Sequence, residues 1–71
     1  MYLKLRGRIV ELYGTISTFS QVIGLSKNSV SMKLNGKKGF SQKDIIHWCE
    51  KLSIKTEEIG SYFFADEVQP K

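Results

Sequence analysis

Residues 15–38 decide the fold, and they read TISTFSQVIGLSKNSVSMKLNGKK. The first half of this stretch predicts a short helix, because Ile16, Phe19 and Ile23 repeat at the spacing of one helix face. Thr15 precedes them and is expected to cap the helix. A glycine follows the last of them, and glycine suits a helix end because it tolerates a positive φ.

A second helix is expected from Lys27 to about Asn35, with Ser26 as its N-cap and a glycine after its end. Its apolar stripe is narrow, because only Val30 and Leu34 lie together, four residues apart. The opposite side carries short or hydrogen-bonding side chains and no carboxylate: Lys27, Asn28, Ser29, Ser31 and Met32. Such a helix suits the major groove of DNA, which is about 12 Å wide and lined with donors, acceptors and thymine methyl groups.

These spacings resemble the helix-turn-helix of the phage Cro and repressor proteins. In that family an apolar–small pair is followed after three residues by Gly–aliphatic–Ser, and later by a β-branched core residue and by Asn–Gly. The matching residues here are Phe19–Ser20, Gly24–Leu25–Ser26, Val30 and Asn35–Gly36. One position departs from the pattern, since the leading helix often begins with a phosphate-binding Gln and here begins with Ile16. The resemblance implies a lambda-repressor-like fold, a DNA-binding transcriptional regulator and a role in the lysis–lysogeny decision.

Three further helices are expected over residues 2–13, over residues 42–52 and from Thr56 onward, with Thr56 as the N-cap of the last. Ser41 and Asp44, three residues apart, predict a capping box at the second of these helices. The residues expected to face the core are Leu5, Ile9 and Leu12, then Ile45, Cys49 and Leu52, and finally Ile59, Tyr62 and Phe63.

Ile46 and Trp48 are expected to flank the middle of these three stripes, and Phe40 to cover the core. We therefore predict an all-α, compact five-helix bundle. Residues 1–65 would form a helix-turn-helix DNA-binding domain, and residues 66–71 a polar C-terminal tail.

The size and composition of the chain exclude several classes of protein. A chain of 71 residues holds one small domain, whose core contributes only about 3–5 kcal/mol of net stability. A single cysteine, Cys49, excludes an internal disulfide framework and a multi-cysteine zinc site, and we expect it to be buried. The only histidine, His47, is expected at the surface. These residues offer no catalytic constellation, no metal site and no cofactor site, and no apolar run is long enough for a membrane helix.

Charge is distributed unevenly along the chain. Residues 1–38 hold seven Lys or Arg and one acid, a net +6, whereas residues 39–71 hold four Lys and six acids, a net −2. The basic half coincides with the predicted helix-turn-helix, which favours a polyanionic partner. Arg6 and Arg8 fit either phosphate contacts or an ordinary solvated surface.

The sequence therefore predicts that one set of residues contacts the bases of double-stranded DNA and another set contacts its phosphates. Asn28 is expected to pair with adenine, Lys27 to reach guanine O6 and N7, and Met32 to pack on a thymine methyl group, with Ser29 and Ser31 as adaptable partners. Helix N-termini and the lysine-rich loop would hold the phosphates. The candidate phosphate contacts are Thr15, Ser17, Asn35, Lys37, Lys38 and Ser41.

Proteins of this kind usually bind palindromic operators as two-fold dimers, with half-sites about 34 Å apart. The candidate dimer patch is Tyr62, Phe64 and Val68, and such a regulator would work in the cytoplasm of a bacterial host. An antitoxin or host regulator with the same domain fits the sequence equally well. An alternative from another class is a protein-interaction module that kept the fold and does not bind DNA.

Overall fold

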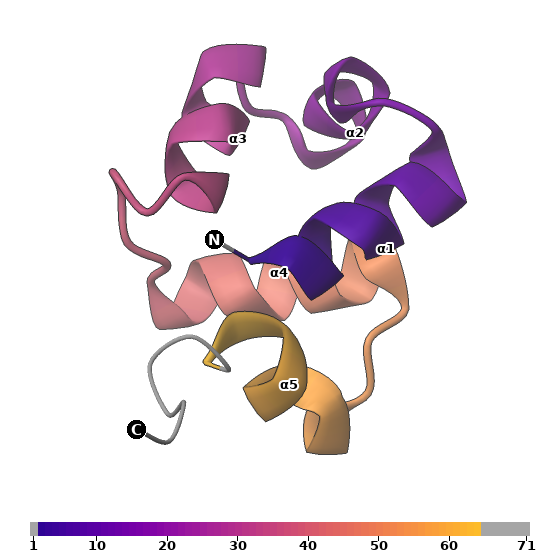
Figure 1. Ribbon diagram of the computed structural model, residues 1–71, viewed down its shortest axis with the longest axis vertical. Coiled ribbons are helices and arrows are strands. Elements are labelled where there is room, and N and C mark those ends of the chain that lie inside the picture. Colours follow the sequence, from indigo (N-terminus) through magenta and orange to yellow (C-terminus); the bar gives the residue numbers. More distant parts are fainter. Residues whose placement is uncertain (1, 65–71) are drawn as a thin grey trace.

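Five α-helices and one short 3₁₀ helix follow one another in the part of the chain that the structure, a computed structural model, describes, residues 2–64. They are α1 (Leu3–Tyr13), α2 (Ile16–Ile23), α3 (Lys27–Leu34), α4 (Gln42–Leu52), η1 (Thr56–Glu58) and α5 (Ile59–Phe63). Figure 1 shows α2 and α3 together at one end of the molecule and α5 at the other, with α1 crossing α4 between them. The predicted all-α, five-helix bundle is confirmed.

Hydroxyl side chains begin three of the helices, as predicted. The Thr15 Oγ1 accepts a hydrogen bond from the Thr18 N–H at 3.1 Å, and the Ser26 Oγ accepts one from the Ser29 N–H at 3.0 Å. Ser41 forms a capping box with Asp44, which satisfies the backbone N–H groups of both residues at the start of α4. These caps fix the start of α2, α3 and α4, and so fix where the chain turns into each of these helices.

The prediction that Thr56 caps the last helix is wrong. Lys55 takes the cap position, and its N–H donates to the Glu58 Oε1 at 3.1 Å. Thr56 is instead the first residue of η1, which leads directly into α5. The reason is the burial of Ile54, which is only 7% exposed and was expected in a plain linker. Because Ile54 enters the core, the chain turns one residue earlier and more tightly than a standard α-helical start.

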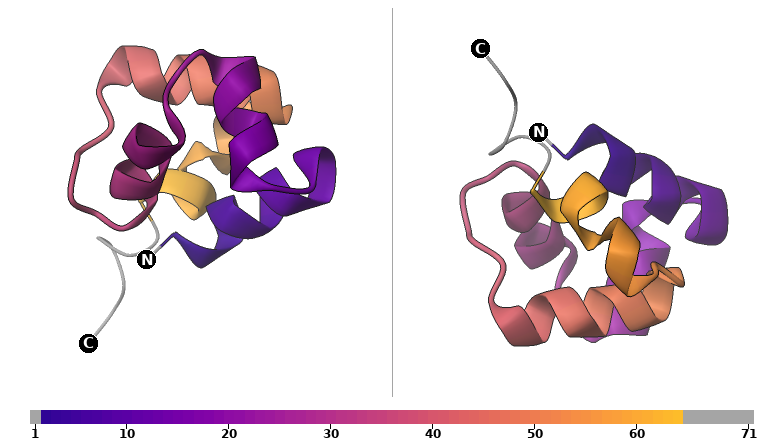
Figure 2. Two further views of the ribbon diagram at one scale, coloured as in Figure 1. Left: turned by 90° about the horizontal axis from the view of Figure 1, so that it is seen from above. Right: turned by 90° about the horizontal axis from the view of Figure 1, so that it is seen from below.

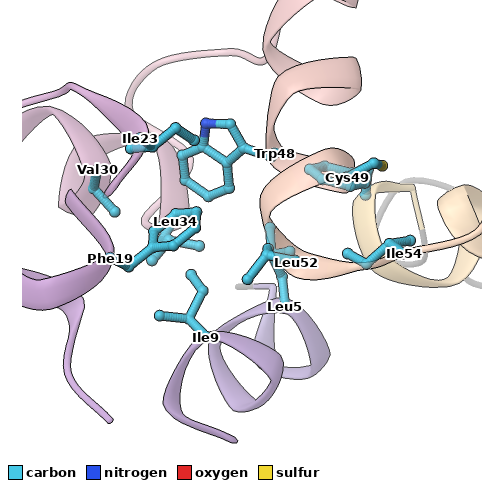
Figure 3. Packing of buried hydrophobic residues seen from close by; sticks show 11 residues of the cluster. Leu5, Ile9, Phe19, Ile23, Val30, Leu34, Trp48, Cys49, Leu52 and Ile54 are labelled. Carbon is cyan, nitrogen blue, oxygen red and sulfur yellow. The ribbon is translucent and has the colours of Figure 1, made fainter. Parts of the chain in front are cut away.

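The core is built from all five α-helices around one indole ring. Figure 3 shows Trp48 of α4 facing residues of α1, α2 and α3, and it has no exposed surface. Its ring meets those of Phe19 at 5.0 Å and Phe40 at 4.8 Å between centroids, both edge to face. The buried apolar residues are Leu5, Ile9, Phe19, Ile23, Val30, Leu34, Trp48, Cys49, Leu52, Ile54 and Phe63.

Two predictions about the core need correction. Trp48 is the centre of the core rather than a flank, whereas Ile46 is exposed as a flanking residue should be. Leu12 is 43% exposed and does not belong to the core. The last turn of α1 contacts the bundle through Tyr13 instead, whose ring packs 5.4 Å from that of Phe19 and whose hydroxyl donates to the Lys51 carbonyl.

The C-terminal end of α4 is tied to α1 by side chains. The Arg8 Nε donates to the Leu52 carbonyl at 2.9 Å, and its Nη2 donates to the Ser53 carbonyl at 3.2 Å. The last carbonyls of a helix lack intrahelical partners, and a cation placed there also complements the helix dipole. Arg8 therefore has a structural role, which answers the choice that the sequence left open between a phosphate contact and a solvated surface.

Candidate nucleic-acid interface

Two fully buried side chains hold helix α3 against the core of the bundle. Val30 and Leu34 are fully buried, whereas the other residues of α3 are exposed or half-buried. Lys27 and Asn28, in the first turn, are exposed. In Figures 1 and 2 the outer side of α3 and the loop after it form one edge of the molecule. This is the arrangement that the sequence predicts for a helix that reads a groove.

The outer residues of α3 contact one another along the helix. The Asn28 Nδ2 lies 3.6 Å from the Met32 Sδ, so the amide and the thioether form a pair four residues apart. Met32 and Ser31 are half-buried, and so is Ser29, whose Oγ accepts a hydrogen bond from the Ser26 hydroxyl at 3.1 Å. A serine hydroxyl in that position still has its own proton to donate. The surface of α3 thus offers an amide, a hydroxyl, a thioether and an ammonium group.

The carboxylate of Asp44, in α4, lies near the end of α3, and Lys33 of α3 neutralises its charge. The Lys33 Nζ lies 2.8 Å from the Asp44 Oδ2 and donates to the Gly39 carbonyl at 3.0 Å. The hydrogen bond from Lys33, followed by the one from the Ser41 N–H, lowers the pKa of the Asp44 carboxyl. Lys33 therefore holds the loop after α3 in place, and its charge is directed to the protein's own carboxylate.

The loop after α3 presents two lysines on a fixed backbone. Gly36 has a φ of 78°, and the N–H groups of Lys37 and Lys38 both donate to the Met32 carbonyl, at 2.8 and 3.2 Å. Only a residue that tolerates a positive φ allows this tight turn, which explains the glycine. Both lysine side chains are exposed beside the C-terminal end of α3. They place two positive charges next to the candidate base-reading surface.

Asn35 is a capping residue with a long-range partner that sequence reasoning missed. The Arg6 Nη2 of α1 donates to the Asn35 Oδ1 across 29 positions of the chain. This contact uses the oxygen of the Asn35 amide, so its NH₂ group is the part suited to a phosphate. No local pattern in the sequence marks such a pair, because its two members lie on different helices.

The N-termini of α2 and α4 differ in what they offer an anion. At α2, Thr15 and Ser17 are exposed, and the first turn contains no acidic residue. At α4, the Ser41 Oγ accepts the Asp44 N–H at 3.1 Å, and the Asp44 carboxylate accepts the Ser41 N–H at 3.0 Å. A phosphate near Ser41 would therefore face a carboxylate, whereas one near Thr15 would meet only hydroxyl and N–H groups.

The candidate dimer patch is only partly a surface. Tyr62 is half-buried, with the Lys4 Nζ 4.7 Å from the centroid of its ring, and Phe64 is 37% exposed. Val68 lies outside the described residues. The two remaining residues of the patch thus contribute one exposed aromatic ring.

The remaining expectations concern residues away from α3. His47 is exposed, as predicted, and its Nε2 lies 3.2 Å from the Ile23 carbonyl at the end of α2. Cys49 is buried, as predicted, and burial raises the pKa of its thiol. Within residues 2–64, no group of three or more His, Cys, Asp or Glu residues is placed to hold a metal ion. None of the helices in this range has the length and apolar character needed to cross a membrane.

Comparison with known proteins relates this chain to a phage regulator. Its structure is similar to the solution structure of the modulator of repression of the temperate bacteriophage TP901-1 from Lactococcus lactis, with a TM-score of 0.81 and 36% sequence identity. The match covers 89% of this chain and 85% of the other. No curated protein sequence matches. A family model described as "Protein of unknown function (DUF739)" matches residues 1–66, and the chain therefore belongs to that family.

Proposed function

We propose that this protein is a phage regulatory protein that binds operator DNA by laying α3 in the major groove. The observation that carries the proposal is the outer surface of α3. Lys27 and Asn28 are exposed on a helix that is anchored by Val30 and Leu34 and carries no carboxylate. Such a surface matches the donors, acceptors and methyl groups of base edges and avoids repulsion from the phosphates.

In this proposal Asn28 pairs with adenine, Lys27 reaches guanine, and Met32 contacts a thymine methyl group, with Ser29 and Ser31 as further partners. The pairing of the Asn28 amide with the Met32 thioether at 3.6 Å supports a shared role, since both side chains would enter the same part of the groove. The side chains of Asn28, Ser29 and Ser31 are short, so the helix backbone must approach the bases closely for them to make contact.

The phosphate grip comes mainly from the N-terminus of α2 and from the loop after α3. Thr15 and Ser17 supply hydroxyl groups at a helix end without acidic residues, and Lys37 and Lys38 supply charge. Asn35 contributes through its NH₂ group. Ser41 has the smallest share, because the Asp44 carboxylate accepts its N–H group.

A role in the lysis–lysogeny decision, as in the Cro-type proteins, is supported by the similarity to the modulator of repression of a temperate bacteriophage. We further propose that two copies read a palindromic operator in the host cytoplasm. An antitoxin or a host regulator built on the same domain would share the DNA-binding surface but not this role.

One observation favours a second candidate function. The similar phage protein is a modulator of repression rather than a repressor. A chain of this kind would also fit a role in which it binds a repressor protein and changes that protein's activity, without contacting DNA itself. The surface of α3 would then meet a protein partner.

Selection of bound sequences from a random pool of duplex DNA tests the proposal. We expect an enriched motif, with palindromy if two copies bind. A salt titration on the enriched duplex should then lower the logarithm of the binding constant by about 0.9 per neutralised phosphate for each unit of log salt. Absence of enrichment, together with binding that does not depend on salt, would reject the DNA-binding proposal and favour the second candidate.

A further inference from the structure

The outward face of α1 is apolar, and no other element within residues 2–64 covers it. Leu3 is 80% exposed and Val10 53% exposed, which makes them the two most exposed large hydrophobic side chains among residues 2–64. They lie seven residues apart and therefore on the same side of the helix. Figure 1 shows α1 in front of α4, and both views of Figure 2 place α1 at an edge of the molecule.

A glycine lies between these two side chains on the same face. Gly7 is exposed, and a Cβ added to it would meet no atom within 4 Å. Neither the packing of this chain nor a positive φ requires glycine at this position, since the positive-φ glycines are Gly14, Gly24 and Gly36. Glycine is among the least favourable residues in a helix interior. Its presence is explained if another helix approaches α1 closely at this point.

The charged residues of this face are arranged so that those of one copy complement those of a second copy. Lys4 and Glu11 lie on one flank of the stripe, seven residues apart, with Gly7 between them. Within one copy, the Lys4 Nζ lies 4.7 Å from the centroid of the Tyr62 ring, and the Glu11 Oε1 lies 3.5 Å from the Arg8 Nη1. Both Lys4 and Glu11 are nevertheless exposed to solvent, whereas Arg6 donates to Asn35. If two copies of α1 cross antiparallel at Gly7, a two-fold axis brings Lys4 of each copy beside Glu11 of the other.

The same antiparallel crossing matches the apolar side chains. Leu3 of one copy then lies over Val10 of the other, and the pair occurs twice because a two-fold interface is self-complementary. We propose that two copies of this chain associate through the outer face of α1, antiparallel, with Gly7 at the crossing. This interface does not involve DNA and lies on a different helix from α3, so it is independent of the function proposed above.

The area of this face sets the strength of the association. Helix α1 has 11 residues and is therefore about 16 Å long. One helix of this length offers less than the roughly 800 Å² per partner of a stable interface. The self-association is therefore weak, and we expect it as a concentration-dependent monomer–dimer equilibrium rather than a permanent dimer.

Sedimentation equilibrium of the full chain without DNA, over a wide concentration range, tests the proposal. The wild-type protein should dimerise reversibly, and Gly7→Gln should lower the association constant about tenfold or more by blocking the close approach. Glutamine is a better helix former than glycine, so the melting temperature of Gly7→Gln should stay equal or rise. A lower association constant in this variant therefore reports the interface and not unfolding.

A matched pair of variants controls for non-specific hydrophobic association. Val10 and Ile46 are almost equally exposed, at 53% and 52%, but lie on different helices. Val10→Gln should weaken self-association, whereas Ile46→Gln should leave it unchanged. Phe64→Ala provides a third comparison, because it reports the alternative interface on α5.

Charge reversal gives the sharpest readout. Lys4→Glu should weaken dimerisation about threefold or more by placing two carboxylates together, and the double variant Lys4→Glu/Glu11→Lys should restore it. A wild-type protein that stays monomeric at every concentration overturns the proposal. So does dimerisation that is lost equally in Val10→Gln and Ile46→Gln, or lost in Phe64→Ala but retained in Gly7→Gln.

Discussion

The Arg6 guanidinium of α1 donates a hydrogen bond to the Asn35 side-chain oxygen, at the residue that ends α3. This contact joins the first helix of the bundle to the helix proposed to read DNA. Val30 and Leu34 fix α3 from beneath, and the contact with Asn35 fixes its end. The position of α3 on the bundle is thus set by two buried side chains and two polar links, the second of which is the ion pair of Lys33 with Asp44 of α4.

A double-mutant cycle on Arg6→Ala and Asn35→Ala measures this link. We expect a coupling energy of about 0.5 kcal/mol in the free energy of unfolding, because the pair is exposed to solvent. Urea denaturation of the four proteins gives the value. Strict additivity of the two single substitutions would show that the contact does not restrain α3.

Asn28→Ala tests the proposed reading of bases. It should cost about 1–3 kcal/mol of binding free energy at the selected operator and little on random duplex DNA. Lys37→Ala serves as the matched phosphate variant and should weaken binding to both DNAs alike, with a smaller salt slope. Fluorescence anisotropy on both duplexes separates the two. If Asn28→Ala weakened binding equally on both, Asn28 would be assigned to a phosphate.

The sequence predicts α2 and α3 well because their determinants are local. The caps at Thr15 and Ser26 and the spacing of Val30 and Leu34 act within a few residues, and all appear in the structure as expected. The position of Asn28 on the outer side of α3 follows from the same spacing. These features need no knowledge of the rest of the chain.

The features that the sequence did not predict depend on contacts between distant segments. Arg8 binds carbonyls 44 and 45 positions away, and Ile54 enters the core from what looks like a linker. Helical spacing also cannot distinguish two candidates at neighbouring positions. Leu12 and Tyr13 both fit the face of α1, and only the location of the α4 carboxyl end decides between them.

This choice leads to a pair of contrasting stability predictions. Leu12→Ala should change the free energy of unfolding by less than about 1 kcal/mol, since the side chain is 43% exposed. Tyr13→Phe should cost about 1 kcal/mol, because the hydroxyl donates to the Lys51 carbonyl. Thermal and urea denaturation of both variants provide the comparison. A larger loss for Leu12→Ala would return that residue to the core.

The interaction of Lys33 with Asp44 predicts a dependence of stability on pH. The pKa of Asp44 is lowered in the folded protein, chiefly by the hydrogen bond from Lys33. The carboxylate therefore stabilises the fold above its unfolded pKa, near 3.9, and this contribution is lost as the pH falls through the lower folded pKa. Asp44→Asn should lower stability at neutral pH and flatten the curve in acid. Parallel curves for both proteins below about pH 4 would contradict this.

Ser53 offers a stabilising substitution at the end of α4. It has a φ of 55° and a ψ of 43°, which is the left-handed conformation that favours glycine. Ser53→Gly should remove this backbone strain and raise the free energy of unfolding by about 0.5–1 kcal/mol, less any gain in the entropy of the unfolded chain. The Ser53 carbonyl that accepts the Arg8 guanidinium remains in the variant, so the link between α1 and α4 is preserved. Ser53→Ala is the matched control, because alanine keeps the strain and loses only the hydroxyl. Equal melting temperatures for the glycine and alanine variants would show that the left-handed conformation at this position costs the fold nothing measurable.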